Sequence, residues 1–215
     1  MNYSVVIVAA GASTRFNQGI SKMLYRFSDG IKVIDRTIRT FERDDDCRQI
    51  VVVCSNEVMD YLTFNHFNAR ITLCYGGTSR QESVCHGLMA VTEKLVMIHD
   101  GARCFLERED LESLKQKMSE ENGALLVKSM VDTVKVVKDG VVISTLDRDS
   151  LKRAQTPQAF PTAELIRCYR QAEKDGFSAT DDSQLVERYS NMKVVCVESK
   201  GHNTKVTVID DVRGE

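Results

Sequence analysis

The sequence has 215 residues, of which 42% are hydrophobic and 28% charged, and its formal net charge is −2. A chain of this length can bury one substantial core and is short for two, so we expect a single domain over residues 1–215. The nearly neutral charge argues against a broad nucleic-acid or anionic-membrane surface, because such surfaces need many clustered cations. We therefore expect neither a nucleic acid nor a membrane as a partner.

Cysteine usage and hydropathy bear on the cellular compartment. The seven cysteines form no Cys-x-x-Cys pair, and several lie in apolar runs where a small hydrophobic side chain packs. No apolar stretch approaches the roughly 18 residues of a membrane span. The N-terminal apolar run lacks the basic segment of a signal peptide. We therefore predict a soluble, cytoplasmic protein with free thiols.

Short β-rich runs alternate with helical patterns over the first part of the chain. We expect strands at 4–10, 49–55, 70–75, 94–100 and 123–129, and helices at 33–44, 56–64, 79–93 and 108–122. Nearly continuous apolar strands joined by helices are typical of a parallel sheet that is covered on both faces. The pattern predicts a three-layer, Rossmann-like α/β fold with a mostly parallel sheet.

Two helix ends have local signals. Ser79 can cap the third helix, and Glu82, three residues later, completes a capping box. Gly123 is expected to close the fourth helix before the next strand.

The pattern changes over residues 132–150, where two alternating runs flank Asp139-Gly140. This dipeptide is a strong signal for a two-residue β-hairpin turn. An isolated hairpin is only marginally stable, so we expect this one to pack on the parent sheet or on another subunit. A helix at 162–176, a helix beginning at Thr180-Asp181 and a strand at 193–199 complete the chain.

The first candidate binding segment follows the first strand. In an open α/β sheet, ligands bind beyond the carboxyl ends of the strands. The small residues Ala9–Gly11 leave the backbone accessible, Ala12–Thr14 can offer N–H groups to phosphate, and Arg15 and Lys22 can clamp it. The segment matches neither a Walker A loop nor a dinucleotide fingerprint. Taken alone, it can equally be a tight turn.

The second candidate is Asp100, which ends an apolar strand just before Gly101, where the chain must turn. Its carboxylate is expected to point into the same crevice as the first segment. One interpretation is a Mg²⁺ ligand, because Mg²⁺ needs only one or two carboxylates besides phosphate oxygens and water. The alternative is a helix cap or turn aspartate. Arg103 can bind a further phosphate, and His99 is expected to be a packed, satisfied residue rather than a base.

The third candidate is the turn Gly76-Gly77, which allows close backbone approach. Arg80 and Ser83 follow on the first turn of the capped helix. The alternative is a glycine turn before an ordinary helix.

These segments together resemble one family. In order, they are AAGASTRF…SKML, GGTSRQESV, HDGAR, DTVK, RAQTPQAF, TDDSQLVE and NTKVT. This set is similar to the 2-C-methyl-D-erythritol 4-phosphate cytidylyltransferase family of the non-mevalonate isoprenoid pathway, over nearly the whole chain. The resemblance implies a nucleotidyltransferase that joins CTP to the phosphate of methylerythritol phosphate and releases pyrophosphate, with Mg²⁺ or another divalent cation as cofactor.

The resemblance also implies roles for individual residues. The residues that would line the nucleotide site are Ala9, Ala10, Gly11, Gly76, Gly77 and Ser83. In catalysis, charge would be neutralised by Arg15, Lys22 and Lys205, and Asp100 would bind Mg²⁺. The sugar phosphate would be held by Arg103, Thr133, Thr156 and Lys205, and Arg148 would reach the site of the partner subunit. The hairpin would then be a dimerisation arm exchanged between two subunits of a homodimer.

Three features depart from the family's pattern. Cys104 stands where proline is common, and Lys152 stands where an aromatic residue often follows the arm. Relatives usually continue beyond VIDDVRGE into a C-terminal helix, so either part of the natural end is missing or this member dispenses with that helix.

Two other functions stay open. One is a cytidylyltransferase for another polyol phosphate, such as ribitol 5-phosphate. The other is a catalytically inactive nucleotide-binding homologue, which is disfavoured because the charged residues of the motifs are all present. A nicotinamide dehydrogenase would share the architecture but lacks its fingerprint here.

Overall fold

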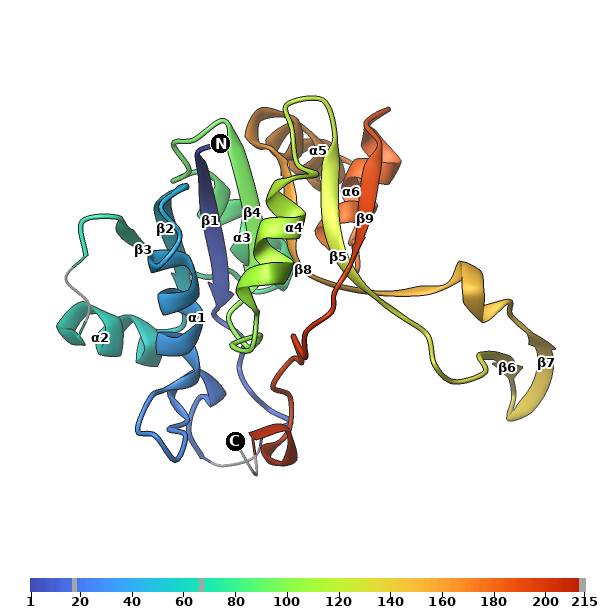
Figure 1. Cartoon of the computed structure of the whole chain (residues 1–215), viewed down its shortest axis with the longest axis horizontal. Helices are drawn as coiled ribbons and strands as arrows, with labels where there is room; N and C mark the ends of the chain where they lie inside the picture. The colour runs from blue at the N-terminus through green and yellow to red at the C-terminus, as the bar shows by residue number, and fades with distance from the viewer. Residues whose placement is uncertain (17–18, 66–67, 213–215) are drawn as a thin grey trace.

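The computed structural model describes residues 1–16, 19–65 and 68–212 (Figure 1). A seven-stranded sheet with the order β3-β2-β1-β4-β8-β5-β9 forms its centre, and a two-stranded sheet, β6-β7, lies apart from it. The strands are β1 (Tyr3–Ala9), β2 (Cys47–Cys54), β3 (Ile71–Tyr75), β4 (Leu95–Asp100), β5 (Gly123–Ser129), β6 (Lys135–Lys138), β7 (Val141–Thr145), β8 (Lys152–Pro161) and β9 (Val194–Glu198). The α-helices are α1 (Val33–Glu42), α2 (Asn56–Asn65), α3 (Arg80–Leu88), α4 (Arg108–Lys115), α5 (Thr162–Lys174) and α6 (Asp182–Tyr189), and the 3-10 helices are η1 (Lys22–Leu24), η2 (Arg148–Ser150) and η3 (Ile209–Val212).

The central sheet is mostly parallel, as predicted. Strands β3, β2, β1 and β4 pair in parallel, and so do β5 and β9. Only β8 runs antiparallel to both of its neighbours, β4 and β5. The pattern of apolar runs missed β8, because two prolines within ten residues argue against a central strand. Pro157 fits because the pairing with β5 skips from Gln158 to Ala154, so its missing N–H interrupts no ladder.

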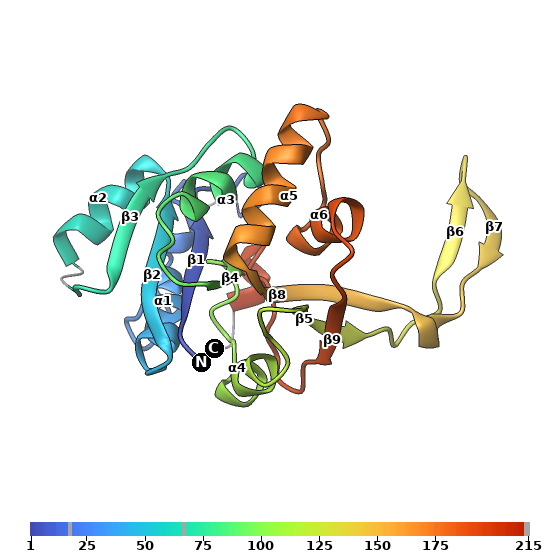
Figure 2. The ribbon, with the colours of Figure 1, turned by 90° about the horizontal axis from the view of Figure 1, so that it is seen from above.

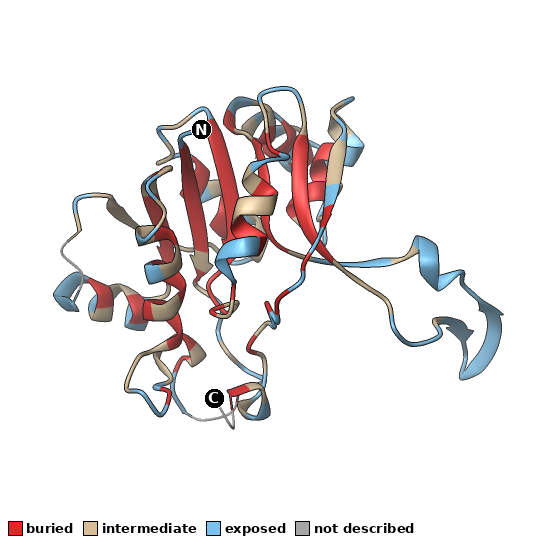
Figure 3. Cartoon of the chain, viewed as in Figure 1, coloured by how far each residue is buried: buried red, intermediate tan, exposed pale blue. Residues whose placement is uncertain are grey.

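Helices cover both faces of the sheet, which confirms the three-layer fold (Figure 2). Helices α1, α2 and α4 contribute to one buried apolar cluster, and α3, α5 and α6 contribute to the other. Along β1, Val5 and Ile7 belong to the first cluster and Val6 to the second. Side chains that alternate in this way between two covered faces explain why the strands read as continuous apolar runs. Figure 3 shows the resulting buried centre of the sheet.

The predicted cap of α3 is confirmed. The Ser79 side chain accepts a hydrogen bond from the backbone N–H of Glu82 at 3.0 Å. The Glu82 carboxylate accepts from the backbone N–H of Thr78 at 2.7 Å, one residue before the cap. The first turn of α3 is therefore fixed on both sides of Ser79, which holds the preceding loop close to the helix.

The predicted role of Gly123 is wrong. Helix α4 ends at Lys115, and Gly123 is the first residue of β5. An added Cβ at Gly123 would lie 2.6 Å from a ring carbon of Phe160 on β8. The glycine therefore allows close packing inside the sheet and does not end a helix.

The predicted hairpin has the expected turn and an unexpected environment. Asp139 and Gly140 have φ values of 52° and 78°, which is the left-handed pair that a two-residue hairpin turn requires. Both strands are exposed along their whole length and extend away from the sheet (Figure 3). Of the two predicted locations, the parent sheet is therefore excluded, and packing on another subunit stays a prediction.

Across the described part of the chain, none of the helices has both the length and the apolarity that crossing a bilayer would take.

Candidate active site

A cleft lies where the strand order reverses. The chain passes from β1 to β2 and β3 on one side, and β4 pairs with β1 on the other. The carboxyl ends of β1 and β4 thus flank a switch point of the sheet, where open α/β folds bind ligands. A cavity of about 360 Å³, here called the strand-end cleft, occupies this position. Of the residues singled out in the sequence, its lining includes Ala9, Ala10, Gly11, Lys22, Gly77, Ser83, Asp100 and Lys205.

Small residues form one wall of the strand-end cleft. A Cβ added at Gly76 would lie 2.2 Å from the Cβ of Ala10, so the backbone of Gly76 packs directly against the side chain of Ala10. The backbone N–H of Gly77 donates to Oγ of Ser83 at 3.0 Å, and that hydroxyl donates to the carbonyl of Ser79 at 2.8 Å. The structure therefore brings the first and third candidate segments together.

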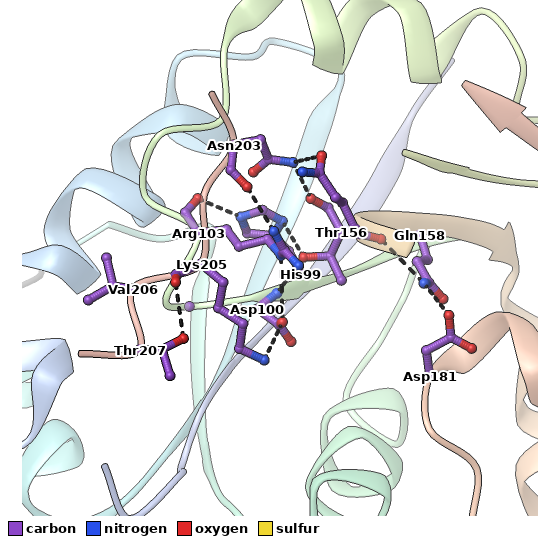
Figure 4. Close-up of polar contacts among 12 residues, drawn as sticks. His99, Asp100, Arg103, Thr156, Gln158, Asp181, Asn203, Lys205, Val206 and Thr207 are labelled. Atoms are coloured by element: carbon purple, nitrogen blue, oxygen red, sulfur yellow. Dashed lines mark hydrogen bonds and ion pairs between the residues drawn. The ribbon is translucent and has the colours of Figure 1, made fainter. Parts of the chain in front are cut away.

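Asp100, which also lines the strand-end cleft, lies among cations, of which Figure 4 shows Arg103 and Lys205. Its Oδ2 is 2.8 Å from Nζ of Lys205 and 3.7 Å from Nε of Arg103, and its Oδ1 accepts from Nε of Arg80 at 3.3 Å. Burial alone would raise the pKa of this carboxyl, but Arg80 and Lys205 outweigh burial and hold the pKa below its usual range. Asp100 is therefore a fixed negative charge at the end of β4.

A buried hydrogen-bonded group supports Asp100 from behind. Nε2 of His99 lies 3.1 Å from the carbonyl of Arg103, which can only accept, so Nε2 carries the proton. Nδ1 then accepts from the Thr156 hydroxyl at 3.2 Å, and the Thr156 oxygen accepts from the Asp100 backbone N–H at 3.0 Å. Burial lowers the pKa of His99 to about 4. His99 is thus neutral and satisfied, as expected, and Thr156 lies directly behind Asp100.

Lys22 reaches the same cleft from η1. Its Nζ donates to the carbonyl of Val206 at 2.9 Å. Burial lowers the pKa of Lys22, the nearby charge of Lys205 lowers it further, and Asp100 offsets part of this effect. Arg15 itself is exposed on the loop after β1 and is not part of the cleft lining. Several like charges held close together indicate a site built for an anion.

A second cavity adjoins the first. It encloses about 510 Å³, and its lining includes the cations Arg103, Lys128, Arg153, Lys200 and Lys205. We call it the basic cavity. Nε of Arg103 is buried there without a hydrogen-bond partner among the described residues. Lys205 lines both cavities, so the two meet at this side chain.

The two predicted arm residues do not reach either cavity within this chain. Thr133 and Arg148 are both exposed. Nη1 of Arg148 donates to the carbonyl of Val131 at 2.8 Å, which ties the two sides of the arm together at its foot. Lys152, one of the departures from the family pattern, pairs with Glu198 at 3.1 Å near the same place.

Arg80 is the charged residue among the described cleft lining to which the sequence gave no role. It lies three residues before Ser83 on α3, and residues at this spacing share one face of a helix. Its partners are Asp100 and Asp182, which is 102 residues away in sequence. The three-residue spacing from Ser83 could have placed Arg80 at the cleft, but no local pattern could reveal its partners.

The residues of the strand-end cleft fit a magnesium ion that binds mainly through phosphate. Within the described ranges, no three His, Cys, Asp or Glu side chains gather into a metal-binding group. Asp100 is the one carboxylate among the described residues that line the cleft. Mg²⁺ is commonly bound by one or two carboxylates together with substrate phosphates and water. The donor set matches that mode of binding rather than a cage of protein ligands.

Comparisons with known proteins identify the family of this chain. Residues 3–214 match the model of the family described as 2-C-methyl-D-erythritol 4-phosphate cytidylyltransferase. The chain belongs to this family. It is 39% identical over 219 residues to the protein of that name from Bacillus licheniformis, covering 99% of this chain and 93% of the relative. The protein of the same name from Bacillus velezensis is 37% identical over 217 residues, with coverage of 99% and 93%.

Solved structures give the same result. The 4-diphosphocytidyl-2C-methyl-D-erythritol synthase from Anaerococcus prevotii has a TM-score of 0.86 at 30% identity, covering 98% of this chain and 92% of that one. The 2-C-methyl-D-erythritol 4-phosphate cytidylyltransferase from Thermus thermophilus has a TM-score of 0.80 at 26% identity, with coverage of 99% and 96%. As a member of this cytidylyltransferase family, the chain is a nucleotidyltransferase, and the resemblance read from its motifs is confirmed.

Proposed function

We propose that the chain transfers CMP from CTP to 2-C-methyl-D-erythritol 4-phosphate and releases pyrophosphate. CTP would occupy the strand-end cleft, and the acceptor phosphate would enter the basic cavity. The observation that carries this proposal is the junction of the two cavities at Lys205, whose Nζ lies 2.8 Å from Asp100. A transfer between two anions needs their sites to meet at a cation.

The small-residue wall suits the nucleoside. Cytosine and ribose would lie against Gly76, Gly77 and Ser83, where the close approach to Ala10 leaves little room for side chains. The triphosphate would extend along the segment after β1, toward Lys22. Arg15 would join it from its exposed loop once the ligand is bound.

Positioning and charge neutralisation would carry the chemistry. The nucleophile is a phosphate monoester, whose second pKa of about 6 leaves it mostly dianionic at neutral pH. No general base is therefore needed. A phosphate oxygen of the acceptor attacks the α-phosphorus of CTP in line, a new P–O bond forms, and the bond to the β-phosphate oxygen breaks. Lys22 and Lys205 would stabilise the charge that spreads in this transition state.

Asp100 would hold a magnesium ion together with the phosphates of CTP. When bound, the ion would supply positive charge and Lewis acidity at the phosphate oxygens. Lys205 and Arg80 already contact this carboxylate, so they would share it with the metal.

The arm would complete the site of a second subunit. Its exposed apolar side chains include Val137, Val141, Val142 and Ile143, which are 56–63% exposed in the isolated chain. Several exposed apolar side chains on one protruding segment are typical of a protein–protein interface. In a homodimer, Thr133 and Arg148 of one arm would reach the acceptor phosphate bound to the other subunit. The reaction would take place in the cytoplasm.

Pyrophosphate release tests the proposed function. The protein is incubated with CTP and Mg²⁺, with methylerythritol phosphate and ribitol 5-phosphate in parallel and with ATP and UTP as nucleotide controls. Release with methylerythritol phosphate and CTP supports the proposal. Release with ribitol phosphate alone overturns the acceptor assignment, and no release with either supports an inactive homologue.

Two lysine variants, one in the site and one far from it, test the role of Lys205. Lys205→Ala should lower kcat by about 100-fold or more, because it removes a cation from the reacting phosphates. Lys115 also pairs with a partly buried aspartate, Asp44, at 2.9 Å, but at the opposite end of the strands. Lys115→Ala should keep the turnover of the wild-type protein. Equal losses in the two variants would assign Lys205 a structural role only.

A further inference from the structure

Arg80 joins two carboxylates that come from distant parts of the chain. Its Nη2 donates to Oδ2 of Asp182 at 2.8 Å and its Nη1 to Oδ1 at 3.3 Å, which is a two-pronged contact. Its Nε donates to Oδ1 of Asp100 at 3.3 Å. The guanidinium therefore lies between the start of α6 and the end of β4, while its side chain lines the strand-end cleft. A planar fork bound at both ends has little freedom to rotate.

Asp182 is itself held on every side. Its side chain is fully buried, and its Oδ1 also accepts from the hydroxyl of Tyr169 on α5. The side chain of Gln158, on β8, contacts the two residues that flank Asp182. Gln158 donates to Asp181 at 2.9 Å and accepts from the backbone N–H of Ser183 at 2.9 Å. A buried carboxylate with this many partners cannot move without leaving a buried charge unpaired. It is therefore a rigid anchor for Arg80.

The two oxygens of Asp100 have different partners because of this anchor. Lys205 and Arg103 both lie on the side of Oδ2, at 2.8 Å and 3.7 Å. Among the described residues, Arg80 is the cation that pairs with Oδ1. Without it, the carboxylate would turn toward Lys205 and Arg103 and would draw Lys205 away from the junction of the two cavities.

We propose that Arg80 is a positioning residue, fixed by the buried pair Tyr169–Asp182, that sets the orientation of the Asp100 carboxylate between the two cavities. This role rests on the proposed function, because the orientation matters only if two phosphates meet there. Loss of the anchor should therefore lower kcat and leave the KM values for CTP and for the acceptor nearly unchanged.

Tyr169→Phe tests the anchor with the smallest change, since it removes one hydroxyl that does not touch the cleft. Its matched control is Tyr3→Phe, because the Tyr3 hydroxyl also donates to an aspartate, Asp44, at 2.7 Å, at the other end of β1. Loss of one such hydrogen bond in the anchor should lower kcat about fivefold. Tyr3→Phe should keep the wild-type kcat, while both variants should lower the melting temperature by about 2–4 °C.

Arg80→Lys provides a second, stronger test. Lysine keeps the charge but lacks the fork that contacts Asp182 and Asp100 together. Misplacing reacting groups by about 1 Å can cost about 100-fold, so we expect a fall in kcat of about 30- to 100-fold with each KM changed less than about threefold. A proportional rise in the KM for CTP with little change in kcat would show that Arg80 binds the nucleotide instead, and would overturn the proposal.

A spectroscopic readout separates this proposal from the proposed function. The ¹⁵N-resolved Nε–H signal of Arg80, assigned by its loss in Arg80→Lys, should exchange slowly with water in the wild-type protein. Tyr169→Phe should speed this exchange and Tyr3→Phe should not, whether or not the wild-type protein releases pyrophosphate. Identical exchange in the two tyrosine variants would overturn the anchor, and identical kcat values would overturn its catalytic consequence.

Discussion

Thr156→Val removes one hydroxyl from behind Asp100 at nearly constant volume. In the wild-type protein, the Thr156 oxygen accepts from the Asp100 backbone N–H at 3.0 Å and its proton goes to Nδ1 of His99 at 3.2 Å. Thr156 and His99 are buried, so water cannot replace the lost partner. Valine would therefore leave one buried donor and one buried acceptor unsatisfied.

The expected loss of stability follows from those two groups. Each buried polar group left without a partner costs about 1–3 kcal/mol, so the two together should lower the free energy of unfolding by about 2–6 kcal/mol. For a chain of this size, about 1 kcal/mol shifts the melting temperature by about 2–4 °C, so even the smallest expected loss lowers it by about 4–8 °C. The carboxylate of Asp100 also loses its fixed backbone, so kcat should fall as well.

Thr156→Ser is the matched control. Serine keeps the hydroxyl and both hydrogen bonds, and it loses one buried methyl group, which costs about 1 kcal/mol. Thermal unfolding followed by circular dichroism gives both shifts, and pyrophosphate release gives both activities. If the valine and serine variants melt at the same temperature, the hydroxyl does not bridge Asp100 and His99, and the assigned protonation of His99 is wrong.

Three further predictions concern pH, charge and the arm. Burial lowers the pKa of His99 from 6.5 to about 4, so below pH 6.5 the unfolded chain binds more protons than the folded one and stability falls as pH falls. Between pH 7 and pH 5 the free energy of unfolding, measured with denaturant, should fall by about 2 kcal/mol because of His99, and His99→Gln should lack this fall. The same pH dependence in both proteins would contradict the neutral state of His99. Lys22→Ala should lower kcat far more than it raises the KM for CTP in steady-state kinetics, and equal proportional changes would count against its role in catalysis. Arg148→Ala should sediment as a dimer and lose activity, whereas a fully active monomer would refute the proposed arm exchange.

Local patterns in the sequence predicted most of the sheet and its ligand-binding edge. Apolar runs located β1 to β5 and β9, because strands buried on both faces need apolar side chains at every position. Asp139-Gly140 predicted its turn, because few residues adopt positive φ twice in a row. The strand-end motifs predicted that Ala10 and Asp100 share one edge, because the carboxyl ends of parallel strands meet there.

Tertiary structure alone decided which side chains meet across the site. Strand β8 was not predicted, because its prolines argue against a central strand. Its place between β4 and β5 depends on pairing with both neighbours, which no local pattern shows. Arg80 and Asp182, 102 residues apart, form an ion pair only after α3 and α6 pack on the same face of the sheet. Burial and neighbouring charges then set the charge states together: burial keeps His99 neutral, whereas Arg80 and Lys205 keep the buried Asp100 ionised.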